Sequence, residues 1–131
     1  MTSQLASPAF GGTVHALINI PIALPGKDTQ LTSIPIAAGQ TLQAGSVMGI
    51  VTATGEAVLS LAAASDGSER PYAILMEDLD TSLGAQSYPL ASGGVFNELA
   101  LVFGAGHTAD TVRIPLRDRG IYLNVARYSF G

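Results

Sequence analysis

The stretch LQAGSVMGIVTATGEAV, residues 42–58, predicts the architecture of this chain. It holds an apolar run from Val47 to Ala53, the turn Thr54-Gly55-Glu56, and a second apolar run that begins at Ala57. Two apolar runs joined by a short turn that contains glycine are typical of a β-hairpin. We therefore expect a fold built on short β-strands.

The same type of pattern continues on both sides of this hairpin. Before it, Ile34 and Ile36 alternate with Pro35. After it, short apolar segments predict strands at Tyr72–Met76, Leu99–Phe103 and Ile121–Tyr128. Many short strands and one small helix indicate a mainly β or α+β domain.

One helix is expected in the C-terminal half of the chain. Thr108 can cap its N-terminus, Asp110 lies in the first turn, and Gly120 ends it. Pro115 falls in the middle, where a proline removes an N–H donor and clashes with the preceding turn, at a cost of about 3 kcal/mol. We expect either a kink at Pro115 or a short helix that starts there.

The composition of the chain argues for a structural role. Charged residues are only 12% of the 131 residues, against about 25% in typical soluble domains, so other chains are expected to cover part of the surface. The net charge of −4 argues against nucleic acid or an anionic membrane as partner. Without cysteine the chain forms no disulfide or thiolate metal site. The apolar window Val14–Pro25 is too short to span a bilayer, and the N-terminus lacks the basic region of a secretory signal.

None of the motifs with catalytic potential forms a complete site. The segment GAGHTA, Gly104–Ala109, matches a dinucleotide-binding pattern, but too little chain follows for a second βα unit. The acidic segment Glu77–Asp80 is interpreted as a solvated strand end, and His15 and His107 have no metal-ligand spacing. The sequence therefore predicts neither an enzyme nor a cofactor or metal site.

Residues 1–33 are interpreted as an N-terminal arm, followed by a core domain at 34–131. The arm carries an apolar face with a period of two, which consists of Val14, Ala16, Ile18, Ile20 and Ile22. Pro21 limits such a strand to a sheet edge, and an apolar edge strand on an arm is a candidate for joining the sheet of a neighbour. The alternative is a first strand that packs inside its own domain.

Five segments in order resemble the head decoration proteins of tailed bacteriophages, the family of the lambda decoration protein. They are AGSVMGIVTATG (44–55), AASDGS (63–68), PYAILMEDLD (71–80), GVFNELALVFGAGHTADT (94–111) and LRDRGIYL (116–123). The resemblance covers roughly residues 34–123. It implies a small β-clip-like domain with an extended arm that binds the capsid.

The resemblance also implies how such a protein acts. A homotrimer would sit on the outer capsid surface of the virion, at three-fold and quasi-three-fold positions, and clamp neighbouring major capsid protein subunits of the expanded, DNA-filled head. The protein would be made in the host cytoplasm.

A second function stays open at this point, a β-rich module displayed on the virion that binds a host surface or a glycan. A sugar site needs exposed aromatic residues, but this chain has no Trp and only four Tyr, of which Tyr122 and Tyr128 cluster with Phe130 near the C-terminus. The same three residues fit equally well as residues that pack on the strands or as an interface with another chain, and we keep them as candidate interface residues.

Overall fold

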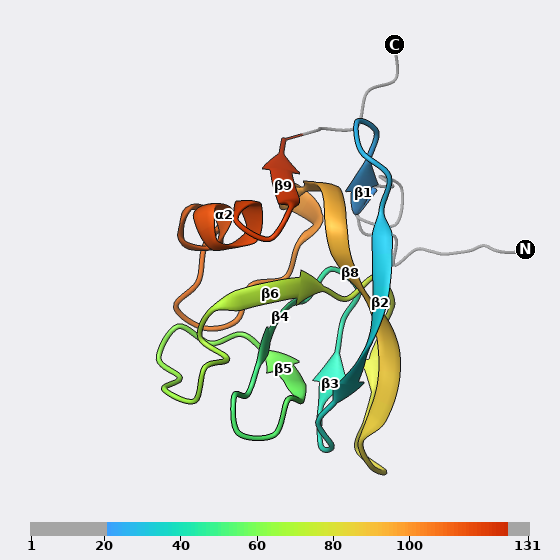
Figure 1. Cartoon of the computed structure of the whole chain (residues 1–131), viewed down its shortest axis with the longest axis vertical. Coiled ribbons are helices and arrows are strands. Elements are labelled where there is room, and N and C mark those ends of the chain that lie inside the picture. Colours follow the sequence, from blue (N-terminus) through green and yellow to red (C-terminus); the bar gives the residue numbers. More distant parts are fainter. Residues whose placement is uncertain (1–20, 126–131) are drawn as a thin grey trace, which may run out of the picture.

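The computed structural model describes residues 21–125, which form a mainly β domain with one short α-helix, as the sequence predicts (Figure 1). The strands of this part are β1 (Ala23–Leu24), β2 (Gln30–Ile36), β3 (Thr41–Leu42), β4 (Val47–Ile50), β5 (Ala57–Leu59), β6 (Pro71–Ile74), β7 (Leu79–Asp80), β8 (Gln86–Asn97) and β9 (Ile121–Asn124). The helical elements are the 3₁₀-helix η1 (Glu98–Ala100) and the α-helix α2 (Ala109–Arg117). None of the helices in this part is long and apolar enough to cross a membrane.

Five of the strands pair in a closed ring, in the order β2, β5, β4, β6 and β8. The β4–β5 hairpin that the sequence predicts is confirmed, with Met48 opposite Leu59 and Ile50 opposite Ala57. The ring closes where Ile74 of β6 pairs with Ala91 of β8. Closure leaves few unpaired strand edges, which limits the aggregation to which an open sheet is prone.

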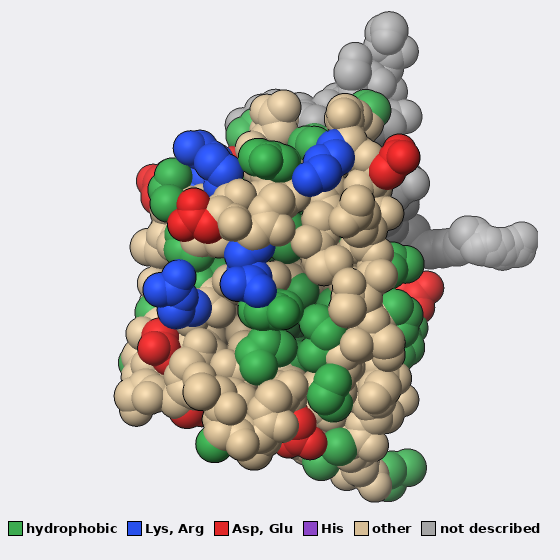
Figure 2. Space-filling model, viewed as in Figure 1, with side chains coloured by type: hydrophobic (Ala, Val, Ile, Leu, Met, Phe, Trp, Pro, Cys, Tyr) green, Lys and Arg blue, Asp and Glu red, His purple; other side chains and the backbone are tan. Residues whose placement is uncertain are grey.

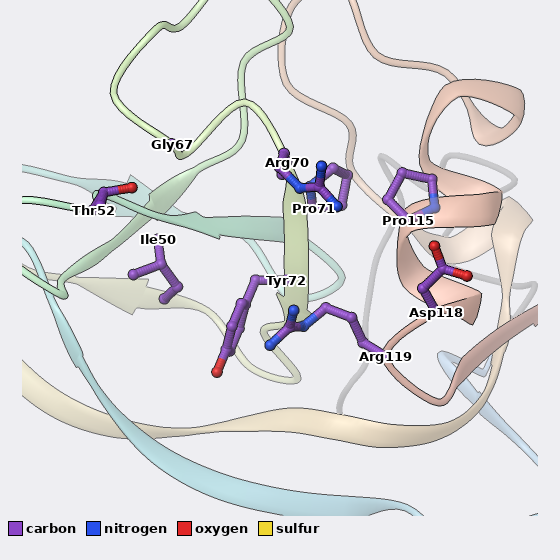
Figure 3. A pocket seen from close by; sticks show the side chains of 9 residues that line it. All are labelled: Ile50, Thr52, Gly67, Arg70, Pro71, Tyr72, Pro115, Asp118 and Arg119. Atoms are coloured by element: carbon purple, nitrogen blue, oxygen red, sulfur yellow. The ribbon is translucent and has the colours of Figure 1, made fainter.

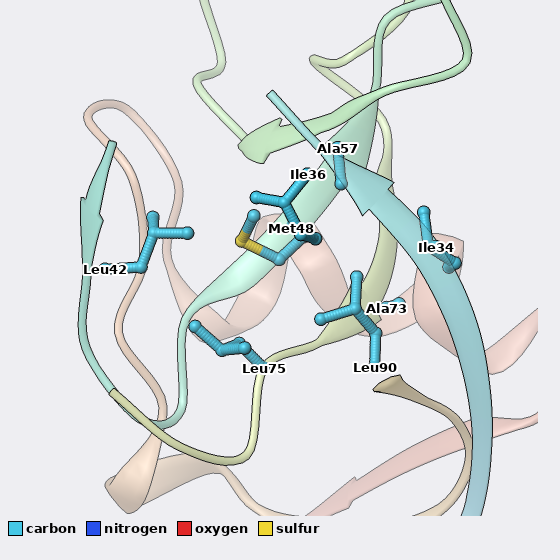
Figure 4. Packing of buried hydrophobic residues seen from close by; sticks show 8 residues of the cluster. All are labelled: Ile34, Ile36, Leu42, Met48, Ala57, Ala73, Leu75 and Leu90. Atoms are coloured by element: carbon cyan, nitrogen blue, oxygen red, sulfur yellow. The ribbon is translucent and has the colours of Figure 1, made fainter. Parts of the chain in front are cut away.

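The interior of the ring holds the first of two hydrophobic clusters. Met48 of β4 and Ala73 of β6 are cross-strand partners, and both are fully buried there. Figure 4 shows how the side chains of this cluster converge from several strands. Its buried members are Ile34, Ile36, Leu42, Met48, Ala57, Ala73, Leu75 and Leu90.

The second cluster lies on the opposite face of the same strands, under α2. Val47 and Ile74 are also cross-strand partners, one residue along from the first pair, and both are buried. Its buried members are Val47, Ile74, Ala91, Phe96, Leu101, Val112, Leu116 and Ile121. Because successive residues of a strand point to opposite faces, β4 and β6 are buried on both sides, which explains their continuous apolar sequences.

The longest strand, β8, is one that the sequence analysis did not assign. Its first part pairs with β2, from Gln86 to Gly93, and its last four residues pair with β9. The predicted strand at Leu99–Phe103 is wrong. Asn97 instead accepts a hydrogen bond from the Leu99 backbone N–H and starts η1, and Val102 forms a single bridge with Ser46.

The predicted helix exists, but it starts before Pro115. Thr108 is its N-cap, and the Thr108 and Thr111 side chains accept hydrogen bonds from each other's backbone N–H at 3.4 and 2.8 Å. Pro115 lies inside the helix. The proline leaves the carbonyl of Thr111 without its helical donor, and the exposure of Thr111 lets water take that place.

The two ends of the described chain flank the same end of β8. Ala23 and Leu24 of β1 pair with Phe96 and Val95, and β9 pairs in parallel with Gly94–Asn97. Part of the predicted arm, including Gln30–Ser33 of β2, therefore belongs to the sheet of this domain. The division of the chain at residue 33 into a capsid-binding arm and a core domain stays a prediction.

Gly49 is a position where the fold has no room for a side chain. A Cβ atom there would lie 2.0 Å from the backbone carbonyl oxygen of Ser68, which cannot rotate away. We expect Gly49→Ala to lower the free energy of unfolding by about 1–3 kcal/mol, because the added atom overpacks the site. Urea denaturation followed by circular dichroism measures this.

Gly93→Ala is the matched control, because its Cβ would meet only the Gln30 side chain, at 3.3 Å. A flexible side chain can move, so the change should stay within about 0.5 kcal/mol. Equal losses in the two variants would contradict the packing described for β4.

Candidate functional site

Most of the predicted arm face lies outside the described residues. Val14, Ala16, Ile18 and Ile20 belong to that part, and Ile22 is the one member of the face that the structure describes. Ile22 is half-buried, packs on the second hydrophobic cluster, and accepts a hydrogen bond from the Asn97 backbone N–H at 2.8 Å. Ile22 thus holds the start of the described chain against the end of β8.

The C-terminal aromatic group is described only at Tyr122, since Tyr128 and Phe130 lie outside residues 21–125. Tyr122 is on β9, is 42% exposed, and has the Lys27 ammonium 5.3 Å from its ring centroid. Lys27 also donates a hydrogen bond to the Gly120 carbonyl at 3.3 Å. Tyr122 therefore offers an exposed aromatic surface next to the point where the described chain ends.

Ser60 and His107 come within hydrogen-bond distance, a pairing that the sequence did not predict. Their Oγ and Nε2 atoms are 3.2 Å apart, and the same Nε2 lies 3.0 Å from the Glu69 carbonyl oxygen. A carbonyl only accepts hydrogen bonds, so Nε2 carries the proton and cannot act as a base toward Ser60. Ser60 is buried and donates to the Ser68 carbonyl at 2.7 Å. His107 fastens the loop before α2 to the rest of the domain.

The acidic side chains are used in local turns and contacts. Asp66 accepts hydrogen bonds from the Ser68 hydroxyl and backbone N–H, which lower its pKa, and the backbone and side chain of Ser82 lower that of Asp80. The Tyr88 hydroxyl donates to the Glu77 carboxylate, which raises the pKa of Tyr88. Among residues 21–125 no group of three His, Asp or Glu side chains is placed to hold a metal ion.

The arginines that lie close in sequence are separated by the fold. Arg113 forms ion pairs with Glu98 and Asp110, at 2.7 and 3.1 Å, and these contacts raise its pKa. Arg119 instead stacks on the Tyr72 ring of β6, with its guanidinium 3.7 Å from the ring centroid. A stacked guanidinium keeps its hydrogen-bond donors free at the ring edge.

Arg119 and Tyr72 form one side of a pocket of about 360 Å³, shown in Figure 3. Arg70 stands on the β6 side of it and Pro115 and Asp118 on the α2 side. In Figure 2, Lys and Arg side chains gather on this face, with a hydrophobic patch beside them. No local sequence pattern indicates this pocket, because its arginines come from distant segments that only the fold brings together.

A family model described as bacteriophage lambda head decoration protein D matches residues 26–117, more than half of the chain. The match spans all strands of the ring and the whole of α2. No curated protein matches the chain. The pockets and side chains described above therefore belong to a domain of a known structural family.

His107→Ala should lower the free energy of unfolding by about 1 kcal/mol, because it removes the hydrogen bond to the half-buried Glu69 carbonyl and the contact with the buried Ser60 hydroxyl. Thermal or urea denaturation measures the loss. Ser87→Ala, at an exposed position of β8, is the control and should stay within about 0.5 kcal/mol. An unchanged stability of the His107 variant would contradict its anchoring role.

The lowered pKa of Asp66 predicts a pH dependence of stability. A carboxylate whose folded pKa lies below its unfolded value of about 3.9 stabilises the fold above that pH, and the contribution is lost as pH falls through the folded pKa. We expect the melting temperature of Asp66→Asn to fall less steeply than that of the native chain as the pH is lowered from about 5 to about 2, an interval that includes the unfolded pKa of the carboxyl group. Asp28→Asn is the exposed control, and parallel curves for all three proteins would contradict the prediction.

Proposed function

Because the chain belongs to the bacteriophage lambda head decoration protein D family, we propose that it binds the outer capsid surface as a trimer and stabilises the expanded, DNA-filled head. The trimer occupies three-fold and quasi-three-fold positions and contacts the major capsid protein. The observation that carries this proposal is the family match over residues 26–117, which spans the whole closed ring.

The architecture of the described domain supports a passive mechanical role. Its strands close on themselves, and the groups that could do chemistry, such as His107 and Ser60, are held in internal hydrogen bonds. A ligand that binds one state of its partner stabilises that state by mass action. Binding to the expanded capsid alone is therefore enough to favour it, and no catalysed reaction is needed.

The arrangement of the chain ends supports a binding role for the arm. Residues 1–20 join the domain at Pro21, next to β1, and residues 126–131 join it after β9, on the other side of the same end of β8. We propose that the arm residues Val14, Ala16, Ile18 and Ile20 add a strand to a capsid sheet and that Tyr122, Tyr128 and Phe130 contact the same partner. Three linked arms give slow dissociation from individually weak contacts.

Co-sedimentation with capsids tests the proposed function. Purified protein is mixed with expanded empty capsids and, as a control, with unexpanded capsids. We expect saturable binding to the expanded capsids, with three copies for each three-fold or quasi-three-fold position. Binding to a glycan array without binding to capsids would contradict decoration and favour the host-surface module.

Deletion of residues 1–20 should preserve the melting temperature of the domain and weaken capsid binding at least about tenfold. This factor corresponds to the loss of the free energy gained by burying one or two isoleucine side chains. Deletion of residues 1–33 removes β1 and four residues of β2 as well, so it should also lower the melting temperature. Unchanged capsid affinity after the shorter deletion would contradict a binding role for the arm.

A further inference from the structure

The pocket beside Tyr72 has the chemistry to receive a carboxylate together with an apolar side chain. Its walls include Ile50, Pro71 and Pro115, and Arg70 and Arg119 stand at its rim (Figure 3). Asp118 is the one acidic residue of the lining, so the two arginines leave the pocket with a net positive charge. All ten Asp and Glu side chains of the sequence lie within residues 21–125. The ion pairs among these residues are those of Arg113, so neither pocket arginine has an Asp or Glu carboxylate of the described residues within 4 Å.

A loop at another place on the molecule has the complementary features. Leu83, between β7 and β8, is fully exposed, at 103%, the highest value among the large hydrophobic side chains of the described residues. Three residues before it, the exposed Asp80 accepts a hydrogen bond from the Ser82 backbone N–H at 2.8 Å. An apolar side chain and a carboxylate therefore project from one short turn.

This loop is rigidly attached to the domain. Thr81 is buried, its hydroxyl donates to the Ala37 carbonyl at 2.7 Å, and its backbone carbonyl accepts hydrogen bonds from Gly39 and Gly84. A rigid loop loses little conformational entropy on binding, so it is suited to act as an anchor. The folded domain therefore holds Leu83 in its exposed position.

The loop cannot serve the pocket of its own chain. It precedes the first residue of β8, at the lower end of the domain in Figure 1, whereas the pocket lies between β6 and α2. A closed three-fold ring uses heterologous contacts, in which two different patches of each copy fit one another. A pocket and a distant complementary loop on the same chain meet this requirement.

We propose that the loop Asp80–Gly84 of one copy enters the pocket of the next copy, with Leu83 against the apolar walls and the Asp80 carboxylate beside Arg70 and Arg119. The proposal rests on the trimer of the proposed function and identifies the contact that forms it. The partner is a second copy of this chain. The Arg119 guanidinium, held by Tyr72, presents its donors to the incoming carboxylate.

Substitution of Leu83 tests the apolar part of the contact. Burial of one leucine side chain changes a dissociation constant by roughly tenfold or more. Leu83→Ser should therefore raise the dissociation constant of the trimer by at least this factor. Sedimentation equilibrium of the full chain over a range of concentrations measures it. Leu31→Ser, at 59% exposure on β2, is the matched control and should leave the association unchanged.

Charge variants test the polar part. Asp80→Asn keeps the oxygen that accepts from Ser82 but removes the charge, and it should weaken association and reduce its dependence on salt. Arg119→Glu should weaken association more strongly, because it adds a like charge beside Asp80. Association that is unaffected by both variants overturns the charged part of the contact.

Disulfide trapping gives a readout that does not depend on loss of binding. The chain has no cysteine, so Leu83→Cys combined with Thr52→Cys, a pocket-lining position, introduces the only two thiols. Oxidation should link copies covalently into trimers that a reducing agent separates. Leu31→Cys with Thr52→Cys is the control and should remain unlinked.

The outcomes separate this inference from the proposed function. A native chain that forms trimers while the Leu83, Asp80 and Arg119 variants associate normally and the thiol pair stays unlinked overturns the contact and leaves decoration intact. Variants that form normal trimers but lose capsid binding also overturn it, because the pocket then faces the capsid. A native chain that stays monomeric at millimolar concentration overturns the contact, and its capsid binding tests decoration separately.

Discussion

The domain depends on the pairing of β4 with β6, because these two strands are buried on both faces. The pair Met48–Ala73 fills the ring and the neighbouring pair Val47–Ile74 packs under α2, so one ladder connects both hydrophobic clusters. The register is fixed, since a shift by one residue would exchange the two faces. The absence of a side chain at Gly49 lets the Ser68 backbone approach this ladder closely.

A fold stabilised in this way leaves its ends and loops available for contacts. Polar side chains that could take part in a reaction form hydrogen bonds within the domain instead, as in the contacts of His107 with Ser60 and Glu69. Both ends of the described chain lie at one end of β8, and a rigid loop with an exposed Leu83 precedes the other end. Such a domain suits the role that we propose for this member of the head decoration family, which is to fasten other subunits.

Local patterns in the sequence predict the hairpin, β6 and α2, because their apolar residues and turn glycines are close in the chain. The sequence analysis did not predict β8, because Pro89 and Gly93-Gly94 are residue types typical of turns. Only the long pairing with β2 makes them part of a strand. Asn97 likewise turns the expected strand at Leu99 into η1. The contact of Arg119 with Tyr72 joins two distant segments, so no local pattern could reveal the pocket.

A cryo-electron microscopy reconstruction of the native particle tests the central claim most directly. The account predicts trimeric density on the outer surface at three-fold and quasi-three-fold positions, fitted by the ring domain with the β1 and β9 end toward the shell. An expanded, DNA-filled particle whose exterior carries no copy of this domain would contradict it.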